Sequence, residues 1–313
     1  MKHIEILTHI LFYSLFLVAL IGICAIGYTE YSQTLALIDQ AETQLQATMS
    51  GPGAIAFQDS NISQSDIIIF RQHLSSILPC FFATIYLYVP VALIIFLIAF
   101  ATAVAAAYNP FSRIVPIARG IIQLIDSIPL VLWVFLAVIV VFRIFSHPQW
   151  GLYFSAFYYP ALSLSYGMVL IVIFFQQNKR IISEIRSHNI LNGEIVSGVG
   201  DVYIIWRMFR FHFAKTIMIR QLIFAFLYVL LFDYCLMYIF EGFRQSGCAL
   251  TPLTVKAGLF FKRLNYYETI HMNDVANIYS HLHAISFILI VLLALISFFF
   301  LFYYFDRKDI IND

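Results

Sequence analysis

Charged residues are scarce in this chain of 313 residues, since only 11% are Asp, Glu, Lys or Arg. Soluble domains carry about 25% charged residues, so the composition excludes an ordinary hydrated surface. Hydrophobic residues make up 62% of the chain, and the mean hydropathy is +0.87. The composition therefore predicts an integral membrane protein.

The chain also lacks a concentrated positive charge. Its net charge is +1, and the basic residues are scattered through short segments without forming a continuous patch. Nucleic-acid binding proteins concentrate Lys and Arg on one face or along one helix. We therefore expect no nucleic-acid partner.

Cysteine is rare, and its spacing carries no metal or redox pattern. The four cysteines contain no CxxC pair, are far apart and mostly lie inside or beside apolar blocks. We interpret them as packing residues rather than as a metal or redox site. They are Cys24, Cys80, Cys235 and Cys248.

Catalytic motifs are missing as well. The chain has no phosphate-binding GxxxxGK[ST] loop, no HExxH zinc motif, no GxSxG nucleophile motif and no DDxxD diphosphate-binding pair. The sequence thus argues against an intramembrane enzyme and predicts that any ATP hydrolysis comes from another chain.

Long apolar blocks are what the sequence does contain. A membrane span needs about 20 mostly apolar residues. The first block is longer than the apolar part of a signal peptide and its start is barely basic, so we expect an uncleaved span. Six blocks qualify, at residues 9–28, 82–108, 120–143, 154–175, 219–240 and 284–305.

The distribution of Lys and Arg predicts the orientation of these spans. With the N-terminus inside, 12 of the 18 basic residues fall on the inner side, although the outer loops are together longer. Cytoplasmic loops are enriched in Lys and Arg, so both termini are expected in the cytoplasm.

This orientation predicts three parts of the chain. Residues 1–81 hold the first span and a polar outer loop, and residues 241–313 hold a second outer loop, the last span and a short tail. A core of spans over 82–240 lies between them, with one long cytoplasmic loop at 176–218.

A charged, glycine-bearing stretch, NGEIVSGVGDVYIIWRMFRFHF, occupies residues 192–213 of that loop. Its apolar residues recur at helical spacing, and its polar residues fall on the other side of the same helix. Gly198 and Gly200 favour a bend. The apolar side of this helix carries Ile195, Val199, Val202 and Trp206, and the polar side carries Glu194, Ser197 and Asp201. Such a helix can lie on lipid headgroups or dock onto a soluble partner.

The spacing in this stretch resembles a known family. Gly200 follows Glu194 by six residues, and an apolar run at 204–206 comes next. Permease subunits of bacterial type I ATP-binding-cassette (ABC) importers carry a cytoplasmic Glu-Ala-Ala motif with Gly six residues after the Glu. The stretches TAVAAAYNPFSRIVPIAR (102–119) and QLIDSIPLVLWV (123–134) are also similar to that family. Departures occur at Ile195, Val196 and Phe213, where the family has two alanines and a proline.

The resemblance implies an all-α permease with six transmembrane helices in the bacterial cytoplasmic membrane. Its implied partners are two ATPase subunits that bind ATP and Mg, a second permease subunit and an extracytoplasmic solute-binding protein. The degenerate motif favours a heterodimer of different permeases. The residues implied to couple to the ATPase are Glu194, Ile195, Val196, Ser197, Val199, Gly200, Asp201, Val202 and Trp206.

The resemblance leaves the substrate open. The large first outer loop and the stretch SDIIIFRQHLSSI (65–77) look like the second permease of dipeptide, oligopeptide or nickel importers, whereas IDSIPLVLWV is similar to phosphonate-type permeases. Peptide-like solutes rank first. A membrane scaffold or assembly protein without transport is the hypothesis from another class, which the departures from the motif support.

Three residues are candidates for the translocation pathway. Asp126 and Pro129 stand near the cytoplasmic start of the third span, and for Asp126 we favour an interfacial acid at a helix start over a place in the pathway. Asp233 lies well inside the fifth span. It can line the path or pair with a polar group on a neighbouring span, because ionisable residues at membrane depth are costly unless they have a partner or a function.

Three histidines near the last span raise the idea of a metal site. His281 and His283 are two residues apart, which places them on different faces of a helix, and no cysteine or carboxylate cluster accompanies them or His271. We expect interfacial histidines and no metal.

Overall fold

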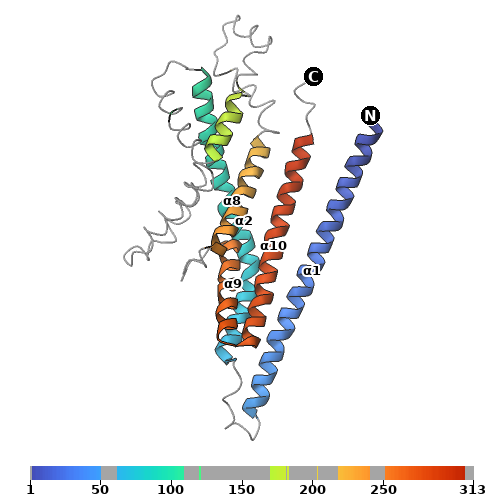
Figure 1. Cartoon of the computed structure of the whole chain (residues 1–313), viewed down its shortest axis with the longest axis vertical. Coiled ribbons are helices and arrows are strands. Elements are labelled where there is room, and N and C mark those ends of the chain that lie inside the picture. Colours follow the sequence, from blue (N-terminus) through green and yellow to red (C-terminus); the bar gives the residue numbers. More distant parts are fainter. Residues whose placement is uncertain are drawn as a thin grey trace, which may run out of the picture. The chain divides into compact units, whose positions relative to one another are not determined.

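The computed structural model of the chain describes residues 2–50, 62–108, 120, 170–180, 182, 203, 218–239 and 251–306. Throughout this part of the chain the regular structure is helical, without strands. The main helices are α1 (Lys2–Ser50), α2 (Gln64–Tyr108), α8 (Ile219–Ile239), α9 (Leu253–Thr269) and α10 (Asn273–Asp306) (Figure 1). The protein is therefore all-α over the described ranges.

Three of these helices are long and apolar enough to cross a membrane. They cover Ile10–Ala47, Gln64–Val104 and Asn273–Tyr303, and they contain the first, second and last apolar blocks of the sequence. This confirms the expectation of a membrane protein. The fifth block coincides with α8, whereas most of the third and fourth blocks lies outside the described residues.

The first two helices are much longer than a bilayer is thick. Their 49 and 45 residues correspond to about 73 and 68 Å at 1.5 Å per residue, against about 30 Å of hydrocarbon. The sequence predicts a polar loop after the first span, yet residues 29–50 and 64–81 are helical. Residues 30–48 contain neither Gly nor Pro, so nothing in them interrupts α1.

The start of α2 is fixed by a reciprocal cap. The backbone N–H of Ser63 donates to Asp66 Oδ2 at 2.9 Å, and the N–H of Asp66 donates to the Ser63 hydroxyl at 3.3 Å. Each side chain thus satisfies a backbone donor that the first helical turn leaves open. The cap explains why a helix, and not a loop, precedes the second apolar block.

The chain divides into two compact units, and α2, α8 and α10 contribute to both of them. The first unit is Met1–Tyr86 with Leu230–Phe299, and the second is Leu87–Val229 with Phe300–Asp313. The described core of the second unit contains Ala103, Phe175 and Ile182.

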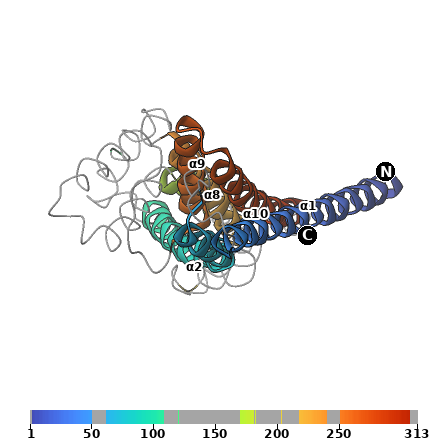
Figure 2. The same cartoon turned by 90° about the horizontal axis from the view of Figure 1, so that it is seen from below.

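Four helical segments of the first unit pack together, and we name them the four-helix cluster. It comprises residues 30–47 of α1, 64–84 of α2, all of α9 and 273–286 of α10 (Figures 1 and 2). Tyr279 lies at the centre of this cluster and is only 1% exposed. Its ring contacts Phe70 edge-on with centroids 5.4 Å apart and stacks on Tyr267 at 5.5 Å. Aromatic burial thus joins α2, α9 and α10.

Candidate functional site

Most of the predicted site residues lie outside the described residues. This holds for Asp126 and Pro129, and for every predicted coupling residue from Glu194 to Trp206. Within that stretch the structure describes only Tyr203, which is helical and exposed. Asp233 is the predicted site residue whose surroundings the structure describes.

Asp233 is buried in α8, with 1% of its surface exposed. Its Oδ2 accepts a hydrogen bond of 2.6 Å from the hydroxyl of Thr254, which is itself fully buried in the first turn of α9. The sequence left two roles open for Asp233, and the structure shows it in a polar contact with another helix. Its role in a translocation pathway stays a prediction.

Next to this contact lies the N-terminus of α9. Its N-cap residue is Pro252, which makes no side-chain capping bond. The N–H of Leu253 instead donates to the hydroxyl of Thr84 in α2, at 2.8 Å. Thr84 in turn donates to the carbonyl of Cys80 at 2.8 Å, so its hydroxyl acts once as donor and once as acceptor.

We name these four residues, Thr84, Asp233, Leu253 and Thr254, the α9 junction. A helix N-terminus carries free N–H groups and a partial positive charge, which favours hydrogen-bond acceptors and carboxylates nearby. Here Thr84 of α2 accepts from the backbone N–H of Leu253, and Asp233 of α8 accepts from the side-chain hydroxyl of Thr254. The arrangement therefore joins three helices through groups that are costly to bury alone.

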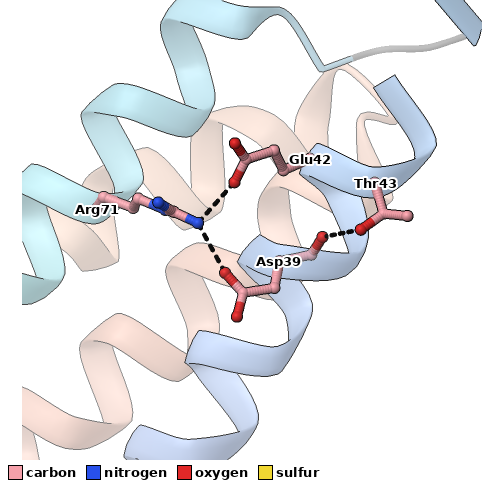
Figure 3. Close-up of polar contacts among 4 residues, drawn as sticks. All are labelled: Asp39, Glu42, Thr43 and Arg71. Carbon is pink, nitrogen blue, oxygen red and sulfur yellow. Dashed lines mark hydrogen bonds and ion pairs between the residues drawn. The ribbon is translucent and has the colours of Figure 1, made fainter. Parts of the chain in front are cut away.

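Ion pairs connect α1 to the rest of the four-helix cluster. Arg71 of α2 donates to Asp39 at 2.8 Å and to Glu42 at 2.6 Å, both on α1 (Figure 3). Nearer the first apolar block, Glu30 of α1 lies 2.7 Å from the Nδ1 of His281 in α10. Two separate polar contacts thus fix α1 against two different helices.

Two cations of α9 are held by neutral aromatic partners. The Nζ of Lys256 lies 3.3 Å from the Nδ1 of His73 and 5.5 Å from the ring centre of Phe260. Burial lowers the pKa of the Lys256 ammonium, because removal from water disfavours its charged form. Arg263 donates to the hydroxyl of Tyr279 at 2.7 Å. Both cations therefore hold α9 against its neighbours.

The three histidines of the metal hypothesis have different surroundings. His281 pairs with Glu30, the ring of His283 lies 5.5 Å from that of Phe261, and His271 occupies the turn between α9 and α10. Over the described residues, no group of three or more His, Cys, Asp or Glu side chains could hold a metal ion. The structure does not bring these histidines together with further ligands.

Sequence reasoning missed Thr84, Thr254 and the ion pairs of α1. Pro252 could have indicated the α9 junction, because it directly precedes a helix and cannot cap it with a side chain. Such a start requires a partner from elsewhere in the fold, although the sequence does not say which one.

Comparison with known proteins adds no relative. No protein-family model matches the chain, and neither the curated proteins nor the solved structures contain a match.

Proposed function

We propose that this chain is the permease subunit of an ATP-driven ABC importer in the bacterial cytoplasmic membrane, with six spans and the fold of type I permeases. The observation that carries the proposal is the six-residue spacing from Glu194 to Gly200, in a basic loop between the fourth and fifth apolar blocks. The helical character of the described residues and their three apolar helices support it.

The proposed mechanism is alternating access. ATP closes two partner ATPases, the helices that carry residues 194–206 move with them, and a pore between two permease subunits opens outward. Rigid helices are suited to this transmission, and α8 begins soon after the coupling segment. ATP and Mg bind to the partners, so this chain transports without catalysing hydrolysis.

The favoured cargo is a peptide or a similar small solute, delivered by an extracytoplasmic binding protein. A small anion such as a phosphonate is the alternative cargo. A second permease of different sequence completes the proposed pore. Two copies of this chain around one pore would contradict the heterodimer.

A membrane scaffold without transport is the second candidate function. The observation that favours it is the degenerate motif, in which Ile195 and Val196 replace two small residues and Phe213 replaces a proline. A bulkier helix fits a groove shaped for alanines less closely. In that case the loop binds lipid or a partner, and no ATPase accompanies the chain.

Copurification separates these functions. We expect the solubilised chain to bring down an ATPase subunit, and Gly200→Trp to lower both the recovered ATPase and transport by about tenfold. Tyr203→Trp is the matched control, because Tyr203 is exposed and already carries a large ring. The proposal would be overturned if no ATPase copurified with the chain. It would also be overturned if both variants retained the ATPase equally and neither lost transport.

A further inference from the structure

An apolar cavity lies between α1, α2 and α10, within the first unit and separate from the α9 junction. Its volume is about 450 Å³, within the range of about 300–1,000 Å³ that is typical of small-molecule pockets. Its walls are mainly aliphatic, and its lining includes Ile23, Cys24, Ser75, Leu78, Ile288 and Leu292.

Contacts between α1 and α10 flank the cavity. On one side of it the ring of Phe16 stacks on Phe299 with centroids 4.0 Å apart, and on the other side Glu30 pairs with His281. Between them, Gly27 approaches α10 so closely that an added Cβ would lie 3.3 Å from the Cγ2 of Ile288. These contacts fix α1 against α10 at several positions along the cavity.

Water is a poor occupant of this cavity. A buried water needs two to four polar partners, and the lining is largely aliphatic. The hydroxyl of Ser75 already donates to the carbonyl of Gln72 in its own helix. An apolar molecule therefore fits the walls better than water does.

The position of the cavity identifies the class of occupant. All three lining helices are long and apolar enough to span a membrane, and the exposed side chains Cys24 and Leu78 open it to the side. Tyr28 and Tyr31 line the cavity where the first apolar block of α1 ends, and tyrosines are enriched where a bilayer meets water. We propose that the cavity binds one acyl chain of a membrane phospholipid, with the headgroup beside these tyrosines.

Native mass spectrometry of the purified full chain tests the site, with palmitoyl-oleoyl phosphatidylethanolamine as the probe. We expect one lipid to bind about tenfold more tightly than any further lipid. Ser75→Phe fills the cavity and should abolish this first tight event. Ser14→Phe is the matched control, because Ser14 is also an exposed helical serine whose hydroxyl donates to its own helix. It should bind the lipid as the native chain does.

Two native cysteines give an independent reading of the same samples. Cys24 lines the cavity, whereas Cys235 is exposed on α8. One equivalent of the lipid should slow the reaction of N-ethylmaleimide with Cys24 at least threefold and leave Cys235 unchanged. In Ser75→Phe, protection of the buried Cys80 from N-ethylmaleimide shows that the variant is folded, and lipid should no longer slow Cys24.

Two results would overturn the proposal. Equal lipid binding by Ser75→Phe and Ser14→Phe would show that the lipid covers the outside of the helices. Equal slowing of Cys24 and Cys235 would show that the lipid shields the whole apolar surface without entering the cavity.

Discussion

Thr84 makes two hydrogen bonds with one hydroxyl, and both partners are backbone groups. It donates to Cys80 within α2 and accepts from Leu253 at the start of α9. The second bond matters more, because Leu253 is fully buried and its N–H has no side-chain cap from Pro252. A buried donor that loses its acceptor carries its full desolvation penalty.

Thr84→Val should therefore lower the free energy of unfolding by about 1–3 kcal/mol, since the new side chain has the same shape but accepts no hydrogen bond. The measurement is equilibrium unfolding in mixed micelles, followed by circular dichroism. Thr102→Val is the control on the same helix, because the Thr102 hydroxyl bonds only to carbonyls of its own helix. Equal effects of the two substitutions would contradict the capping role of Thr84.

The pair of Asp233 and Thr254 should show a coupling energy. Both side chains are buried and their oxygens lie 2.6 Å apart. A double-mutant cycle with Asp233→Ala and Thr254→Val should give about 0.5–1.5 kcal/mol, the usual net range for a hydrogen bond. Additive effects of the two substitutions would mean that the contact contributes nothing to stability.

The sequence singled out Asp233 but not its partner. An acid inside an apolar block is conspicuous, because its burial requires compensation. Thr254 and Thr84 have no such signal, since a threonine is common in any helix and its partner depends on how the helices pack. Pairing between distant segments is set by tertiary packing, which no local pattern encodes.

Among the elements, α1 shows how one small residue sets the distance between two helices. Gly27 faces Ile288 of α10 in close contact, whereas a Cβ on Gly22 would meet nothing within 4 Å. The two glycines stand five residues apart on one helix with the same intrinsic helix propensity. Their substitution therefore separates packing from propensity.

Gly27→Leu should destabilise the protein by about 1–3 kcal/mol, because the added side chain forces α1 away from α10. Gly22→Leu should be neutral or stabilise by up to about 1 kcal/mol, as glycine is a poor helix former. Thermal unfolding of both variants in the same detergent is the measurement. A loss of stability in Gly22→Leu equal to that in Gly27→Leu would contradict the close contact.

The apolar pattern predicted that three of the described helices are long and apolar enough to cross a membrane, but not how far these helices continue. Residues 9–28, 82–108 and 284–305 all fall within helices. The helical extensions escaped prediction because they mix polar and apolar residues, and helices of this kind owe their stability to packing in the four-helix cluster. The contacts of Arg71 with Asp39 and Glu42 belong to this packing, and the sequence alone does not predict them.

At the scale of the whole molecule, the composition predicted a membrane protein, and the distribution of Lys and Arg predicts that both termini lie in the cytoplasm. Only 11% of residues are charged, which sufficed to predict a membrane protein. The proposed coupling segment rests on its spacing alone, because most of it lies outside the described residues.

Labelling from outside the cell tests the orientation. In a cysteine-free background, Ser65→Cys at the start of α2 should react with a membrane-impermeant maleimide in intact cells. Tyr203→Cys, also at an exposed position but in the predicted cytoplasmic loop, should react only after permeabilisation. The reverse pattern would invert the topology and remove the coupling segment from the compartment that holds ATP.

The α9 junction also constrains the order in which the first unit assembles. The N–H of Leu253 and the hydroxyl that it binds are separated by 169 positions along the chain. Contacts of such long range form late, because the intervening chain must first be organised. The acceptors at the start of α9 lie on α2 and α8, which precede it in the chain, so this contact forms only after α9 has been synthesised.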